Sequence, residues 1–90
     1  MGRRRSRRVI ERAIKVYNLV VSANKISTPE LFRRATSEGV VESYSALYQA
    51  LRLLALKGLV TSTSSKGVLW WEPLKIVESR EELEKLLSGT

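Results

Sequence analysis

The sequence contains no cysteine, no histidine and no aspartate. Without cysteine it cannot form disulfides, and without cysteine or histidine it lacks the thiolate and imidazole ligands of common metal sites. The same absence excludes cysteine and histidine nucleophiles and a histidine general base. The carboxylates are all glutamates, and none lies in a recognisable acid–base or metal-binding spacing. We therefore expect that the protein is not an enzyme and uses no metal or cofactor.

Long hydrophobic runs are also missing. No apolar run approaches the ~20 residues that span a bilayer, and arginines occupy the N-terminal region where a signal peptide has its apolar segment. We expect an intracellular, cytoplasmic protein with no membrane partner. Ninety residues form one modest core. This length leaves no room for a separate ligand domain, so no small-molecule ligand is expected.

Positive charge is concentrated at the front of the chain. The net charge is +7, and residues 1–15 hold seven Arg or Lys against one Glu, whereas residues 72–90 hold three against five. Such asymmetry indicates a polyanionic partner. We interpret residues 1–8 as a flexible arm that follows phosphates or enters narrow A/T-rich minor grooves. A membrane surface is disfavoured because the helix that follows lacks a Trp/Phe-rich apolar face. The arginines of the arm are Arg3, Arg4, Arg5, Arg7 and Arg8.

Hydrophobic periodicity predicts three helices, at 6–22, 28–38 and 44–57. Ser6 is the expected cap of the first helix, Thr28 that of the second and Ser43 that of the third. Residues 22–27 are predicted to be a polar connector. Ser79 and Glu82 form a capping box for a last helix, which runs through about Leu87 within residues 79–90.

Alternating β-forming residues predict a hairpin between the third and last helices. Its strands are expected at 59–63 and 68–72, joined by a turn at 64–67. Trp70 and Trp71 are neighbours on the second strand, so they point to opposite faces, and one of them should enter the core. The predicted domain covers residues 9–78.

The segment SYSALYQALRLLALKGLV at 43–60 resembles the recognition helix and wing entry of winged helix-turn-helix transcription regulators. The Thr-Pro-Glu-Leu start of the second helix is also similar, and the resemblance covers about residues 9–72. It implies an α+β, mostly α fold with three helices, a two-stranded β-hairpin wing and a C-terminal helix. The lack of Cys and His makes the chain similar to small archaeal or archaeal-virus regulators. The turn before Ser43 departs from the family, because it is a residue longer than the commonest form and contains the acidic Glu42.

Helix 44–57 carries the candidate DNA-reading residues. With Leu47 in the core, Ser45, Gln49 and Arg52 fall on the opposite face. Gln suits the edge of adenine and Arg suits guanine or phosphate, while tyrosine hydroxyls suit phosphates. An ordinary solvated helix face would show the same pattern. The full set of predicted DNA contacts is the arm arginines Arg3, Arg4, Arg5, Arg7 and Arg8, then Arg33, Arg34, Tyr44, Ser45, Tyr48, Gln49, Arg52 and the hairpin-turn Lys66.

Two further leucines on this helix, Leu53 and Leu56, face away from its core stripe. Exposed leucines mark an interface, and the last helix offers a second apolar strip. We expect these surfaces to form a homodimer, since small regulators gain specificity by reading two half-sites. The alternative is that the last helix folds back over Leu53 and Leu56 within one chain. The predicted dimer residues are Leu53, Leu56, Leu83, Leu86 and Leu87.

The function expected from these features is that of a double-stranded DNA-binding transcription regulator, bound to DNA or the nucleoid in the cytoplasm. An architectural or partition-type protein that coats DNA with weak sequence preference is the alternative in the same class. A winged-helix module that binds other proteins is an alternative of another class, and RNA binding also stays open.

Overall fold

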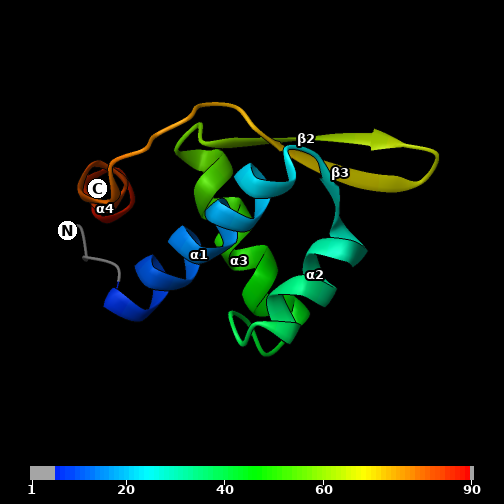
Figure 1. Ribbon diagram of the computed structural model, residues 1–90, viewed down its shortest axis with the longest axis horizontal. Coiled ribbons are helices and arrows are strands. Elements are labelled where there is room, and N and C mark those ends of the chain that lie inside the picture. Colours follow the sequence, from blue (N-terminus) through cyan, green and yellow to red (C-terminus); the bar gives the residue numbers. More distant parts are fainter. Residues whose placement is uncertain (1–5, 90) are drawn as a thin grey trace.

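Four helices and a three-stranded antiparallel sheet make up residues 6–89, the part of the chain that the computed structural model describes (Figure 1). The fold is therefore α+β and mostly helical, as predicted, with one strand more than expected. None of the helices in this part of the chain is long and apolar enough to pass through a bilayer. The elements are α1 (Arg7–Ala23), β1 (Ile26–Ser27), α2 (Thr28–Ser37), α3 (Tyr44–Leu56), β2 (Val60–Ser65), β3 (Val68–Pro73) and α4 (Arg80–Ser88).

The first helix begins where its cap predicts. The Ser6 hydroxyl accepts a hydrogen bond from the Val9 amide at 3.2 Å, which satisfies one of the free N–H groups at the helix start. Arg7 and Arg8 therefore lie in the first turn of α1, and the predicted flexible arm at 1–8 extends two or three residues too far. The remaining arm arginines, Arg3, Arg4 and Arg5, lie outside the described residues.

The sequence predicted Thr28 as the cap of α2, but the cap is Ser27. The Ser27 hydroxyl accepts from the Glu30 amide, and this leaves the Thr28 side chain free to turn inward. There the buried Thr28 hydroxyl donates to the Leu69 carbonyl at 2.9 Å and accepts from the Trp71 indole N–H at 2.8 Å. One hydroxyl thus joins the start of α2 to β3.

The predicted connector at 22–27 contains the extra strand. In β1, Ile26 pairs with Trp71 and Ser27 pairs with Trp70, so the sheet has the order β1-β3-β2. A strand of two residues is too short to show the alternation that identifies strands in sequence. Ile26 and Trp71 are both buried, while Trp70 is only half-buried with the Lys25 ammonium over its ring. The prediction that one tryptophan enters the core is therefore confirmed.

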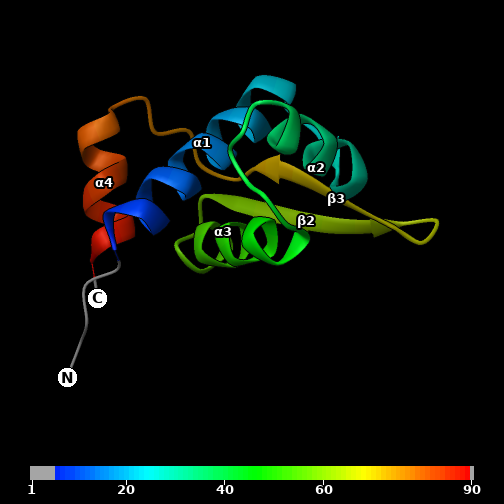
Figure 2. The ribbon, with the colours of Figure 1, turned by 90° about the horizontal axis from the view of Figure 1, so that it is seen from below.

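The hairpin is longer and tighter than predicted. Ser64 and Ser65 belong to β2, where they pair with Leu69 and Val68, and only Lys66 and Gly67 form the turn. Both turn residues have positive φ, 53° and 77°, as a two-residue type I′ turn requires. The hairpin projects beyond the helices (Figures 1 and 2).

The core lies between α1, α3 and the sheet. The inner face of α3 is fully buried, as its leucine spacing predicts, but Leu53 is buried as well, at 7% exposure. The prediction that Leu53 faces outward is wrong because α1 packs against a second side of α3 and widens its buried arc.

The last helix folds back onto α1 of the same chain. Leu83 and Leu87 are buried there and Leu86 is partly buried. Arg80 binds Glu11 of α1 and Glu84 of its own helix. The Tyr17 hydroxyl donates to the Lys75 carbonyl at 2.6 Å and accepts from the Val77 amide at 2.9 Å, so it holds the connector before α4. The leucines predicted for a dimer interface are thus mostly covered within one chain.

Shortening a buried side chain of α4 tests whether this helix packs within one chain or between two chains. Leu87→Ala should lower the free energy of unfolding by about 2–5 kcal/mol, because a fully buried leucine leaves a cavity. The loss should be the same at every protein concentration in thermal unfolding experiments. A melting temperature that rises with protein concentration in the wild type and not in the variant would instead place Leu87 in a dimer interface.

Replacing the bridging hydroxyl tests the link between α2 and the sheet. Thr28→Val keeps the shape of the side chain but leaves the Trp71 N–H and the Leu69 carbonyl without a partner, at an expected cost of about 1–3 kcal/mol in urea unfolding. Thr36→Val is the matched control, because the Thr36 hydroxyl is exposed and bonds only carbonyls of its own helix. Equal stability of the two variants would contradict the bridging role.

Candidate functional site

The outer face of α3 is a strip of polar side chains that no described element covers. Ser45, Gln49 and Arg52 are all exposed, as predicted, and Figure 2 shows α3 along one edge of the molecule with the hairpin beside it. The Ser43 hydroxyl caps the helix by accepting from the Ala46 amide at 3.1 Å. At the other end Gly58 has φ of 72°, and the Leu59 amide bonds the Leu54 carbonyl at 2.9 Å. Both ends of α3 are thus fixed, which holds the strip in place.

An aromatic row borders this strip on the side of the hairpin. The rings of Phe32 and Tyr44 lie 4.7 Å apart, and those of Tyr44 and Tyr48 stack at 5.4 Å. Tyr44 and Tyr48 remain partly exposed, and within residues 6–89 neither hydroxyl has a hydrogen-bond partner. A groove runs from these tyrosines to Gly67 and Val68 of the hairpin. Stacking orders the two rings while their hydroxyls stay available to an external acceptor.

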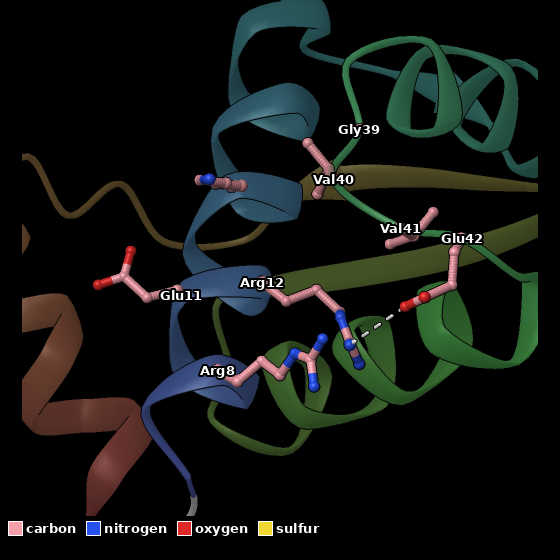
Figure 3. Close-up of a pocket in the computed structure, with 8 residues that line it drawn as sticks. Arg8, Glu11, Arg12, Gly39, Val40, Val41 and Glu42 are labelled. Atoms are coloured by element: carbon pink, nitrogen blue, oxygen red, sulfur yellow. Dashed lines mark ion pairs between the residues drawn. The ribbon is translucent and has the colours of Figure 1, made fainter.

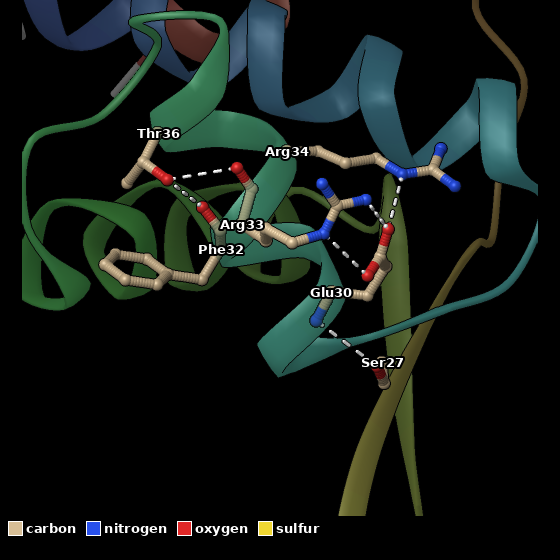
Figure 4. A network of polar contacts seen from close by, with 6 residues as sticks. All are labelled: Ser27, Glu30, Phe32, Arg33, Arg34 and Thr36. Atoms are coloured by element: carbon tan, nitrogen blue, oxygen red, sulfur yellow. Dashed lines mark hydrogen bonds and ion pairs between the residues drawn. The ribbon is translucent and has the colours of Figure 1, made fainter.

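The two predicted contacts on α2, Arg33 and Arg34, are already engaged. Both guanidinium groups converge on the Glu30 carboxylate (Figure 4), with N–O distances of 3.1 Å from each Nε. The hydrogen bonds from Arg33, which have the larger effect, and from Arg34 lower the pKa of Glu30 to about 2. One carboxylate thus offsets one of the two charges, and the pair offers less positive charge than the sequence suggests.

At the tip of the hairpin Lys66 is exposed. Lys66 belongs to the two-residue turn between β2 and β3, which is the far end of the hairpin projection in Figure 1. Of the cations predicted to meet DNA, Lys66, Arg52 and Arg8 are among those with no ion-pair partner within residues 6–89.

The sequence analysis did not single out Arg12. Its side chain is only 16% exposed and faces Glu42 across 3.9 Å, and Arg8 lies one turn earlier in the same cleft. The spacing of Arg8 and Arg12, four residues apart on a helix, was the available signal.

Leu56 is the one predicted interface leucine that stays fully exposed, at 74%. It borders a shallow groove with Val9, Leu53 and Ala55, beside Gln49 and Arg52. Homodimerisation stays a prediction, and of the five leucines proposed for it, Leu53, Leu83 and Leu87 are buried in the single chain.

Across the described part of the chain, no three acidic side chains gather closely enough to hold a metal ion. Comparisons with protein-family models, curated proteins and solved structures find no match to this chain.

The Glu30 cluster, which consists of Glu30, Arg33 and Arg34, should make the stability of α2 depend on pH. Because the pKa of Glu30 in the folded chain, about 2, lies below its ordinary value of 4.5, the cluster stabilises α2 fully above pH about 4.5. This contribution is lost as the pH falls toward 2. A carboxyl NMR titration should give Glu30 a midpoint near 2, and Arg33→Met should raise that midpoint because it removes the strongest hydrogen bond. A wild-type midpoint near 4.5 would contradict the cluster.

Proposed function

We propose that this chain is a winged helix-turn-helix protein that binds double-stranded DNA, with α3 as the recognition helix and the β2–β3 hairpin as the wing, and that it regulates transcription. The observation that carries the proposal is the uncovered polar face of α3, with its ends fixed and an extended hairpin beside it. The element order of helix, strand, helix, helix and hairpin supports it.

The dimensions and chemistry of this face fit the major groove. An α-helix with its side chains is about 10–12 Å across, and the major groove of B-DNA is about 12 Å wide. Gln49 offers the amide that pairs with adenine, and Arg52 offers the guanidinium that pairs with guanine. Tyr44 and Tyr48 present free hydroxyls for phosphates at the groove edge.

Phosphate contacts would surround this base-reading centre. Lys66 stands where a wing meets the DNA backbone or minor groove, and the N-terminal arginines add charge ahead of α1. Arg33 and Arg34 are expected to contribute less to phosphate binding, because both bind the Glu30 carboxylate. These contacts supply affinity with little sequence information.

A DNA-coating protein is the second candidate. Only Gln49 and Arg52 on the α3 face combine the length and the hydrogen-bonding groups that bidentate base contacts need. A small base-reading set beside many cations favours weak sequence preference. Footprinting separates the two candidates, since a regulator protects discrete sites and a coating protein gives protection that spreads.

Three substitutions test the assigned roles in fluorescence anisotropy experiments with a selected duplex and a scrambled one. Gln49→Ala and Arg52→Ala should each reduce discrimination between the duplexes by about 1–3 kcal/mol. Lys66→Asn should weaken binding to both equally and lower the magnitude of the log–log salt slope by about 0.9. Asn is chosen because it tolerates the positive φ of the turn.

The matched control is Lys75→Ala, an exposed lysine in the connector between β3 and α4 and outside the α3 face and the hairpin turn. It should bind both duplexes like the wild type. Equal losses on both duplexes for all three test variants would remove base readout and favour the coating protein. A wild-type chain that binds neither duplex would overturn the proposed function.

A further inference from the structure

A basic cleft lies between the start of α1 and the loop that leads into α3. It is lined by Arg8, Glu11, Arg12 and Lys15 of α1 on one side and by the loop Gly39–Glu42 on the other (Figure 3). Glu42 directly precedes Ser43, the cap of α3, so the cleft opens beside the beginning of that helix. It is separate from the α3 face and from the hairpin tip.

The side chain of Arg12 is only 16% exposed, but its guanidinium is poorly partnered. Its nearest carboxylate, that of Glu42, lies 3.9 Å away, beyond hydrogen-bond distance, and within residues 6–89 the group makes no hydrogen bond. Arginine has five N–H donors, and arginine–carboxylate pairs usually bond through two of them. Arg33 is bonded in that way to Glu30, and Arg80 donates one hydrogen bond to Glu84 and another to Glu11. The N–H donors of Arg12 therefore have no hydrogen-bond acceptor among the described residues.

Arg8 adds a second guanidinium to the cleft. In Figure 3 the Arg8 and Arg12 groups lie close to one another in front of α3, and Arg8 has no ion pair within the described residues. Like charges four residues apart on a helix repel each other. An arrangement that costs stability in the free chain is explained if an anion binds between the two groups.

The acidic residues nearby do not neutralise the cleft. Glu11 points away from the two arginines in Figure 3 and binds Arg80 of α4, which lowers the pKa of Glu11. The Glu42 side chain is 80% exposed and makes only the long contact with Arg12. The cleft therefore holds three cations and two carboxylates. Glu11 is bound to Arg80, and Glu42 is held by one long contact that an incoming anion can displace.

We infer that the cleft binds a phosphate group between Arg8 and Arg12, that Lys15 adds to its positive charge, and that Glu42 competes with the phosphate for Arg12. This inference rests on the proposed function, because the phosphate is that of the DNA strand beside the groove that α3 enters. It extends the DNA contact from α3 to α1. It also gives Glu42 a role as a carboxylate that weakens DNA binding.

The DNA experiment measures the salt dependence of duplex binding by anisotropy for Arg8→Ala, Arg12→Ala and the double variant. Each lost contact should lower the magnitude of the log–log slope by about 0.9, whereas Lys75→Ala should leave it unchanged. Arg8 is exposed, so Arg8→Ala keeps the fold, and Arg12→Lys, which keeps the stem and charge of the side chain, checks that losses in Arg12→Ala do not come from unfolding.

Glu42→Gln tests the competition. It should tighten binding severalfold at low salt, and that gain should disappear when Arg8 and Arg12 are both alanine. Glu81→Gln, an exposed glutamate on α4, is the matched control for the loss of one negative charge. A gain from Glu42→Gln that persists in the double-alanine background would show a general charge effect and overturn the competition.

A second experiment distinguishes the source of the phosphate. Inorganic phosphate is added at constant ionic strength while the Nε–H signals of Arg8 and Arg12 are followed by NMR. If wild type binds DNA and the double variant keeps the wild-type slope, the DNA contact is overturned. Saturable phosphate shifts in that case would assign the cleft to free phosphate, and absent shifts would overturn the site altogether. If wild type binds no DNA, the proposed function fails, and the phosphate titration alone decides whether the cleft binds anions.

Discussion

The hydroxyl of Thr28 connects the helical part of this chain to its sheet. It sits at the first turn of α2 and bonds two groups of β3, the Leu69 carbonyl and the Trp71 indole N–H. Because α2 packs against both α3 and β3, this contact helps to hold α3 beside the hairpin. The strip Ser45, Gln49 and Arg52 and the turn at Lys66 can act on one partner only if that relation is fixed.

The positively charged side chains on the surface fall into two groups, those that bind a glutamate of the chain and those that do not. Glutamates bind some cations within the chain, as Glu30 binds Arg33 and Arg34 and Glu11 binds Arg80. Other cations, among them Arg8, Arg52 and Lys66, have no ion-pair partner among the described residues. Net charge alone does not distinguish these groups, although only the second group is fully available to a polyanion.

Local signals in the sequence predicted the helices, the Ser6 and Ser43 caps and the exposure of the α3 face, because each depends on residues within a few positions of one another. Long-range contacts decided the features that were missed. Thr28 turns inward because Trp71 lies 43 positions later, and Leu53 is buried because α1 crosses its side of α3. Strand β1 exists only through its pairing with β3. The polar face of α3 could be predicted because it follows from the spacing of residues within one helix. The Glu30 cluster and the Arg12 cleft could be recognised only once the positions of the side chains were known.

Mapping amide NMR signals while duplex DNA is added tests the central claim most directly, because it reports which face meets the partner without any substitution. The account predicts that shifts concentrate on Ser45, Gln49 and Arg52 of α3, on the Lys66–Gly67 turn and on the Gly39–Glu42 loop. The amides of α4 and of the connector around Lys75 should change little. Shifts confined to α4 and that connector, or no shifts at all, would contradict the account.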